Sequence, residues 1–183
     1  MQHAREVPQP ACVVVEDHQL FFPEQRISFG QARAVRDYLA STVEVPSKHV
    51  HCLTIDTCQI TDESLALILE GVRMQTPANR RRLYLKKLVV SNTRLGPISM
   101  IQVASIVGSL EDLTLCNIQP QLGRDTIHQL LVAILDHGRR IQKLKLSKMN
   151  LNDHATVQLL IDIMNKQRQV MVKLDLSWAS LSC

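Results

Sequence analysis

A short pattern of apolar residues recurs along the chain. It has the form apolar-x-x-apolar-x-apolar, and in most copies a Leu or Ile follows five residues later. The copies begin at Val50, Leu85, Leu110, Ile141 and Met171, with the copy at Leu110 the loosest. A repeat of about 30 residues indicates units that bury their apolar faces only against their neighbours. The pattern therefore predicts a stack of similar units in place of a single irregular core.

Each unit is predicted to combine a strand with a helix. The three apolar positions of the opening phrase alternate too closely for a helix, so they indicate a short strand with one buried face. A segment with helical periodicity follows each of the first four phrases, and in most of them apolar residues recur at i, i+3, i+4 and i+7. The predicted inner faces are Leu65, Ile68, Leu69 and Val72; Ile98, Ile101 and Ala104; Ile127, Leu130, Leu131 and Ile134; and Val157, Leu160, Ile161 and Met164.

Residues that favour helix ends flank these segments. Thr61, Asp125 and either Asn152 or Asp153 are the expected N-terminal caps. In the short unit that starts at Leu85, the dipeptide Gly96-Pro97 is expected to open the helix. Gly138 stands where a helix commonly ends in a left-handed residue.

The N-terminal part follows the pattern less closely. Residues 10–49 are predicted to form an atypical first repeat or cap, and residues 1–9 a flexible N-terminus. The elements expected here are an irregular strand over Val13–Val15 with Leu20, a capping box of Ser28 and Gln31, and a helical stripe of Ala32, Val35 and Leu39.

The opening phrase resembles a known repeat family. Leu144-Lys145-Leu146-Ser147 and Leu174-Asp175-Leu176-Ser177 resemble the centre of the leucine-rich repeat, and Leu151 and Leu181 match its last apolar position. The helical second half resembles the ribonuclease-inhibitor-like class, over about residues 50–183. The resemblance implies an α/β leucine-rich-repeat solenoid, with parallel strands on the concave side and helices on the convex side.

The chain departs from the family pattern in two places. The usual Asn or Cys after the strand is replaced. The unit at Leu110 continues as Cys116-Asn117-Ile118-Gln119-Pro120. Because of these departures, the resemblance does not determine the curvature of the solenoid. The last repeat, which starts near residue 171, has no helix and is predicted to be incomplete. Missing C-terminal repeats or another chain are therefore expected to cover the edge over Met171–Cys183.

Proteins that resemble this family are mostly binding scaffolds. Side chains that alternate with the apolar strand positions point into the concavity and do not serve the core, so they can vary without changing the fold. The alternative is a solvated sheet face, or one filled by another part of the same protein. The predicted partner-binding residues are Thr54, Asp56, Lys87, Val89, Asp112, Thr114, Lys143, Lys145, Lys173, Asp175 and Ser177.

A basic run stands apart from this surface. Arg80, Arg81 and Arg82 are the densest cluster of positive charge, and they form a candidate docking loop for an acidic protein surface or a polyanion. A solvated insertion is the simpler interpretation, and the sequence favours it. A second basic group lies two units later and contains Arg139, Arg140, Lys143, Lys145 and Lys148.

Composition narrows the classes of function. The net charge is +4, and an aromatic content of 3% leaves little surface for stacking bases, so a nucleic-acid partner is not expected. His49, His51, Cys52 and Cys58 lack the compact spacing of a zinc site, because Cys52 is predicted to face away from the two histidines. No nucleophile elbow or phosphate-binding loop is present in the sequence. We predict no metal, no cofactor, no catalytic residues and no enzymatic activity.

The location is predicted from what the sequence lacks. The five cysteines show no disulfide framework, no secretion signal is visible, and no apolar run is long enough to span a membrane. The expectation is a cytoplasmic protein-interaction scaffold in a larger assembly, for which the family resemblance suggests the cytoskeleton or the cilium. Two rival functions remain, namely a substrate-recognition module of a ubiquitin ligase and a GTPase-regulatory repeat protein. The first requires an adaptor-binding helical segment before the repeats, and the second a fuller horseshoe with a catalytic edge.

Overall fold

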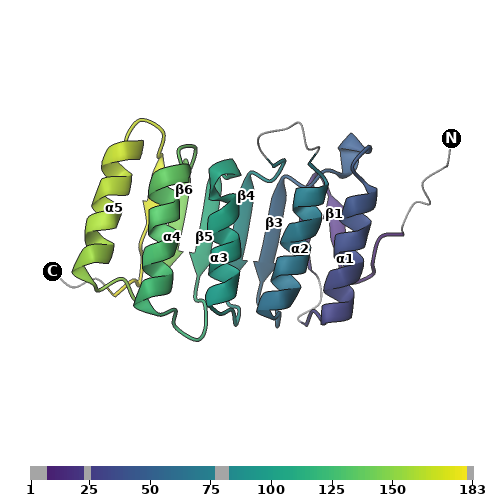
Figure 1. Cartoon of the computed structure of the whole chain (residues 1–183), viewed down its shortest axis with the longest axis horizontal. Helices are drawn as coiled ribbons and strands as arrows, with labels where there is room; N and C mark the ends of the chain where they lie inside the picture. The colour runs from purple at the N-terminus through teal and green to yellow at the C-terminus, as the bar shows by residue number, and fades with distance from the viewer. Residues whose placement is uncertain (1–7, 23–25, 77–82, 181–183) are drawn as a thin grey trace.

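The computed structural model describes residues 8–22, 26–76 and 83–180. They form two layers, a seven-stranded, mostly parallel sheet and a row of helices on one of its faces (Figure 1). The strands are β1 (Val14–Glu16), β2 (Gln19–Phe21), β3 (Cys52–Asp56), β4 (Lys87–Ser91), β5 (Asp112–Cys116), β6 (Lys143–Ser147) and β7 (Lys173–Asp175). The α-helices are α1 (Phe29–Ser41), α2 (Asp62–Met74), α3 (Pro97–Ile106), α4 (Arg124–His137) and α5 (His154–Gln167), and the 3-10 turns are η1 (Pro46–Lys48) and η2 (Val107–Ser109).

The strands lie side by side in sequence order. From β2 to β7 every neighbouring pair is parallel, and only β1 is antiparallel, to β2. The second residue of each repeat strand pairs with the second residue of the next, so these positions form a ladder of leucines. Its members are Leu53, Leu88, Leu113, Leu144 and Leu174, and Leu20 extends it by one strand.

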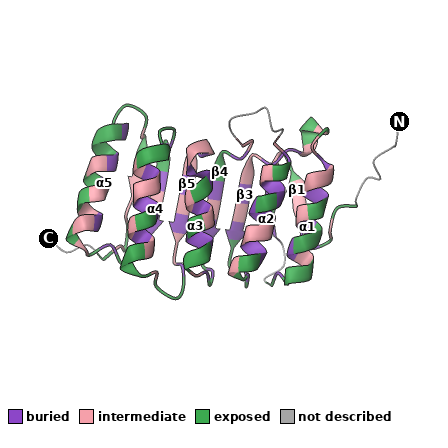
Figure 2. Ribbon diagram, viewed as in Figure 1, coloured by how far each residue is buried: buried purple, intermediate pink, exposed green. Residues whose placement is uncertain are grey.

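The core lies between the sheet and the helices (Figure 2). The residues that open the units at Val50, Leu85, Leu110 and Ile141 are fully buried, and so are the leucines of the ladder up to Leu144. Each fully buried aliphatic side chain contributes about 1.5–3 kcal/mol relative to an exposed one. The repeated apolar phrase therefore supplies one continuous core that runs along the sheet.

Three helices bury the stripes that their periodicity predicted. In α1 the buried stripe is Ala32, Val35 and Leu39. In α2 the inward residues are Leu65, Ile68, Leu69 and Val72, and in α4 they are Ile127, Leu130, Leu131 and Ile134. The start of α2 is also as predicted, because the Thr61 hydroxyl accepts a hydrogen bond from the Ser64 backbone N–H.

Two of the three residues predicted for the inner face of α3 are wrong, and only Ala104 packs, partly buried, against the core. Ile98 and Ile101 are 52% and 54% exposed, whereas Met100 and Val103 pack into the core. The Ser99 hydroxyl donates to the Asp62 carboxylate of α2 at 2.6 Å, and the Gly96 backbone N–H donates to the same oxygen. These bonds turn Ser99 and the neighbouring Met100 towards the core, so the other side of α3 faces solvent. The helix is apolar on both sides, and its sequence alone does not select the buried one.

Part of the predicted stripe of α5 is also wrong. Leu160 is buried as expected, but Ile161 and Met164 are largely exposed, and Ile163 is buried instead. The helix packs against α4. Asp153, which precedes the first turn of α5, forms an ion pair with Arg124 of α4 at 2.9 Å. No described helix lies on the other side of α5 (Figure 1), so that flank stays uncovered.

Both predicted ends of α4 need correction. The helix begins at Arg124 after Gly123, so Asp125 lies within its first turn and is not the cap. Gly138 ends the helix, but its φ of −75° is not left-handed. A Cβ atom at Gly138 would lie 2.6 Å from the Ile134 carbonyl oxygen, so close packing requires a glycine here. The cap of α5, in contrast, is Asp153, one of the two predicted candidates.

The N-terminal region contains a hairpin where one irregular strand was expected. The chain turns at Asp17 and His18, both in the left-handed region, and β2 then joins the parallel sheet. The predicted capping box of Ser28 and Gln31 is present at the start of α1. Gln9 was placed in the flexible N-terminus, but its amide donates to the Val13 carbonyl at 2.9 Å.

At the other end, the sheet closes with a strand of only three residues, β7. Leu174, the last member of the ladder, is only partly buried. Val172 and Trp178 beside it are 79% and 85% exposed. Leu181 of the repeat pattern lies outside the described residues.

We predict that Leu113→Ala lowers the free energy of unfolding by about 2–5 kcal/mol, because it leaves a cavity between two neighbouring ladder leucines. Ile101→Ala is the control, because this side chain is mostly in solvent, and it should change stability by less than about 0.5 kcal/mol. Urea unfolding followed by circular dichroism measures both. A larger loss for Ile101→Ala than for Leu113→Ala would contradict the described core.

Candidate functional site

The helices cover one face of the sheet, and the opposite face, here called the open face, carries the alternate strand side chains. The strand register sorts these side chains into three lanes that run across the sheet. Lane one contains Gln19, Cys52, Lys87, Asp112, Lys143 and Lys173; lane two contains Phe21, Thr54, Val89, Thr114, Lys145 and Asp175; lane three contains Asp56, Ser91, Cys116 and Ser147.

The structure thus brings ten of the predicted partner-binding residues onto one face, in the lanes just given. Ser177 follows β7, and its carbonyl accepts a hydrogen bond from the Lys148 backbone N–H beside lane three. Ser147 differs from the rest of its lane, because it is only 2% exposed and its hydroxyl has no hydrogen-bond partner among the described atoms. At β6, lane three therefore offers no accessible side chain to a partner.

Sequence reasoning missed the contribution of β2 to this face. Gln19 pairs with Cys52 and Phe21 with Thr54, so both lanes extend one strand further towards the N-terminus. The signal was Leu20, which lies between these two residues. One apolar position is too few to define a strand by alternation alone.

Two ion pairs link lysines and aspartates along the lanes. Lys87 and Asp112 lie 3.9 Å apart in lane one, and Lys145 and Asp175 lie 3.1 Å apart in lane two. The hydroxyl and backbone N–H of Ser177 hold the pKa of Asp175 well below its usual range, and Lys145 adds to the effect. Asp175 is thus committed to partners within the protein.

A fourth column of side chains begins where the strands end. The residue directly after each of β3 to β6 has a positive φ, between 51° and 55°: Thr57, Asn92, Asn117 and Lys148. Trp178, at the same position of the repeat but three residues after the end of β7, has a φ of 59°. Asn tolerates this conformation better than most residues, so the two asparagines at equivalent positions were a signal that sequence reasoning did not use.

Polar contacts connect this column to lane three. The Asp56 carboxylate accepts from the Ser91 hydroxyl at 2.5 Å and from the Asn92 amide at 3.0 Å. Asn117 in turn donates to the Asn92 side chain at 2.9 Å. The bonds from Ser91 and Asn92 lower the pKa of Asp56, so its carboxylate is held as part of a fixed polar ladder.

A shallow hollow lies on the open face across β5, β6 and β7. Its volume is about 140 Å³. The residues that line it are Asp112, Thr114, Lys143, Leu144, Lys145, Lys173 and Asp175. Six of these seven were predicted to contact a partner.

The N-terminal edge of the sheet carries a cluster of aromatic rings. His18 and His51 stack with ring centroids 4.4 Å apart, and His49 stacks on Tyr84 at 4.1 Å. His18 Nδ1 lies 2.9 Å from the His49 carbonyl oxygen, which accepts, so this nitrogen carries the proton. Partial burial, and then the nearby His18, Lys86 and His49, lower the pKa of His51.

This cluster has the geometry of stacked rings and not of a metal site. Within residues 8–22, 26–76 and 83–180, no three His, Cys, Asp or Glu side chains are grouped so as to hold a metal ion. His49 is buried, and its ring nitrogen Nε2 lies 2.8 Å from the Val43 carbonyl oxygen.

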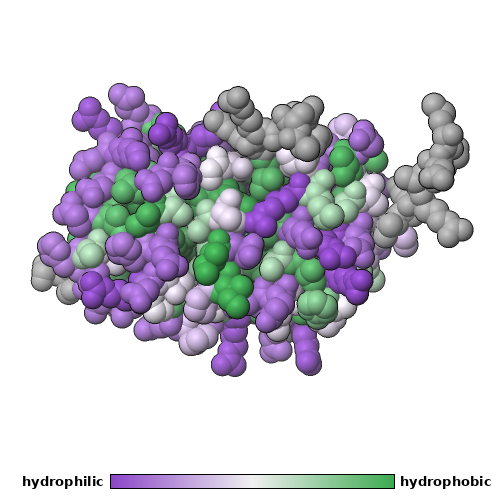
Figure 3. Space-filling model, in the orientation of Figure 1, coloured by the Kyte–Doolittle hydropathy of each residue, from purple (hydrophilic) through white to green (hydrophobic). Residues whose placement is uncertain are grey.

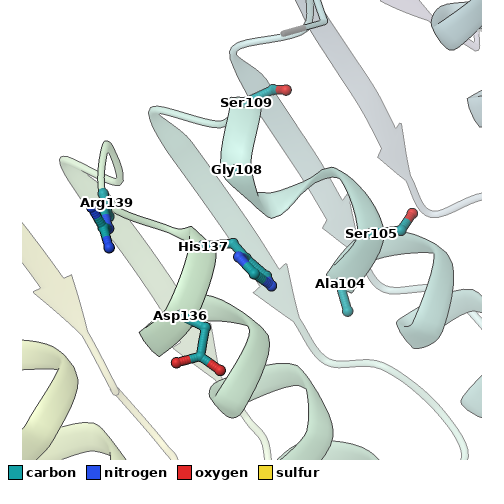
Figure 4. A pocket seen from close by; sticks show the side chains of 7 residues that line it. All are labelled: Ala104, Ser105, Gly108, Ser109, Asp136, His137 and Arg139. Carbon is teal, nitrogen blue, oxygen red and sulfur yellow. The ribbon is translucent and has the colours of Figure 1, made fainter. Parts of the chain in front are cut away.

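The helical side has features of its own. A hollow of about 580 Å³ separates the C-terminal ends of α3 and α4, with Asp136, His137 and Arg139 on one side (Figure 4). Hydrophobic surface also gathers over the middle helices (Figure 3), where Ile98 and Ile101 are exposed. None of these residues was predicted to bind a partner.

The two basic groups are placed differently. Arg80, Arg81 and Arg82 of the predicted docking loop lie outside the described residues. Lys86, just after them, lies 3.8 Å from Glu111 in an exposed ion pair. In the second group, Arg139 and Arg140 are exposed before β6.

Comparison with known proteins adds no family. No protein-family model matches the sequence, and a search of the curated proteins gives no match. Of the helices that the structure describes, none has the length and apolar content that crossing a bilayer requires.

We predict that the chain loses stability as the pH falls below about 6.5, the ordinary pKa of histidine. A lowered pKa of His51 means that the folded state binds fewer protons than the unfolded state. Its contribution is therefore complete above the unfolded pKa and is lost as the pH falls from there towards the folded pKa. His51→Gln should flatten the dependence of the thermal midpoint on pH between 7 and 5.

The control for this experiment is His154→Gln, because His154 is exposed at the start of α5, far from the ring cluster. This variant should keep the pH dependence of the parent chain. If His51→Gln keeps it as well, the stacked cluster is not its source.

Proposed function

We propose that the protein is a non-enzymatic protein-interaction scaffold whose partner lies on the open face of the sheet. The observation that carries the proposal is the division of each strand into two sets of side chains. In β4, Leu88 and Val90 are fully buried in the core. Lys87, before them, and Val89, between them, are not part of the core. Residues of the second kind can change to suit a partner while the fold stays the same.

We further infer that the chain is a leucine-rich-repeat solenoid of the ribonuclease-inhibitor-like class. The parallel strands in sequence order and the helices on one face support this inference. The buried positions of the repeat frame support it too, since Leu95 and Leu151 lie in the core after their strands as the family pattern requires.

The proposed setting is a larger cytoplasmic assembly. The half-buried Leu174 and the exposed Val172 and Trp178 support a further repeat, or another chain, over the last strand. A large exposed apolar group costs solubility unless another surface covers it. A cytoskeletal or ciliary assembly is the narrower hypothesis, and it rests on the family resemblance alone.

Cross-linking of the tagged chain in native extract tests the role of the open face. We expect cross-links to Lys87, Lys143 and Lys173, and we expect Val89→Trp to reduce partner recovery by about fivefold or more, because a bulky ring blocks the lanes. Ile101→Trp is the matched control on the helical side and should retain full recovery. Cross-links confined to the helical side would refute the proposal.

The uncovered last strand leads to a separate prediction. The purified chain should self-associate as its concentration rises, because apolar surface at this edge pairs with a second copy when the proper neighbour is absent. Trp178→Ser should shift the equilibrium towards the monomer in sedimentation velocity runs. A parent chain that is monomeric at every concentration and unfolds cooperatively would contradict it.

A further inference from the structure

We propose that the open face binds an acidic segment of a partner protein, whose carboxylates contact Lys143 and Lys173. This inference rests on the proposed function and assigns the chemistry of the partner. The two lysines are paired neighbours on β6 and β7, and both are exposed.

The aspartates near these lysines are already engaged. Asp112 forms an ion pair with Lys87, on the side away from β6. Asp175 binds Ser177 through Oδ1 and Lys145 through Oδ2. Across the described part of the chain, Lys143 and Lys173 therefore have no carboxylate within ion-pair distance.

Two like charges directly opposite each other on neighbouring strands destabilise a sheet. Here Lys173 lies on β7, whose pairing with β6 is limited to three residues. The two side chains form no attractive charge contact with each other, because both are positive. A bound anion relieves this repulsion from outside.

The hollow beside the lysines has the size and polarity for such a group. Its volume of about 140 Å³ is a few times the share of one water molecule, which is about 30 Å³. Thr114 lines it together with Lys143 and Lys173. Asp112 and Asp175 also line the hollow, but their carboxylates are paired with Lys87 and Lys145. A carboxylate that enters it lies near the two lysines that are unpaired among the described residues and near the Thr114 hydroxyl.

The surrounding charges favour a protein segment over a nucleic acid. Asp112 lies beside Lys143 in lane one, and Asp175 lies beside Lys145 in lane two. A phosphate backbone carries a charge at every nucleotide and would meet these aspartates. An extended peptide has same-side residues about 7 Å apart, and its acidic positions can alternate with uncharged ones, whereas a phosphate backbone has no uncharged position.

Fluorescence anisotropy with a defined probe tests the proposal on the full chain. The probe is a labelled eight-residue peptide of alternating Glu and Ser, at low ionic strength. The parent chain should bind it, and Lys143→Gln/Lys173→Gln should weaken binding about tenfold or more, because two charge-assisted contacts are lost. Lys143→Arg/Lys173→Arg keeps both charges and should retain most of the affinity.

The control variant Arg33→Gln/Arg168→Gln removes the same net charge from exposed positions on α1 and after α5. It should stay within about twofold of the parent chain, and an equal loss would mean that only net charge matters, which overturns the proposal. Lys143→Gln/Lys173→Gln should also be at least as stable as the parent chain. A clear loss of stability would indicate a structural role for the lysines and count against a binding role.

The remaining outcomes separate this inference from the proposed function. If Val89→Trp abolishes peptide binding and Lys143→Gln/Lys173→Gln does not, the open face binds partners without these lysines and only the acidic-segment proposal fails. No binding of the Glu-Ser peptide by the parent chain overturns it as well. Tighter binding of a twelve-residue oligothymidine than of the peptide would overturn the choice of a protein partner.

Discussion

The in-register pairing of the strands is the constraint on which the rest of the structure depends. Leu113 pairs with Leu88 on one side and Leu144 on the other, so every strand presents its leucine to the same layer. Successive strand residues point to opposite faces, and a slip of one residue would exchange the buried and exposed sets. The register that builds the core therefore also decides that Lys87, Asp112 and Lys143 lie in one lane. Core and candidate site are two consequences of the same alignment.

The sequence predicts the elements that this alignment uses, and it fails where a neighbour decides. The strand phrases and the stripes of α2 and α4 follow from periodicity, because one side of each helix is clearly apolar. In α3 both sides are apolar, and the contact of Ser99 with Asp62 on another helix selects the buried side. Gly138 was recognised as special for the wrong reason, because the approach of Ile134 and not its φ requires a glycine. Tertiary packing determines these features, and the local sequence pattern does not reveal them.

The candidate site was also predictable from the sequence only in part. Alternation along each strand predicts which side chains leave the core, but the pairs they form across strands need the register as well. The ion pairs of Lys145 with Asp175 and of Lys87 with Asp112 appear only when the strands are aligned. The lysines that those pairs leave over, Lys143 and Lys173, were therefore not distinguishable from their neighbours by sequence. The lane that starts at Gln19 was missed because its strand is too short to show a period.

Two features of the isolated chain oppose its own stability or solubility, and both lie at the C-terminal end of the sheet. One is apolar, with Val172 and Trp178 exposed, and the other is ionic, with Lys143 and Lys173 side by side. They respond to salt in opposite directions, because added salt screens exposed charges and excluded salts such as sulfate strengthen apolar burial. An assembly that uses both surfaces would thus hold its edge contact as ionic strength rises while it loses the contact on the open face. Ionic strength is therefore a physical variable that separates the two interfaces, although both involve β7.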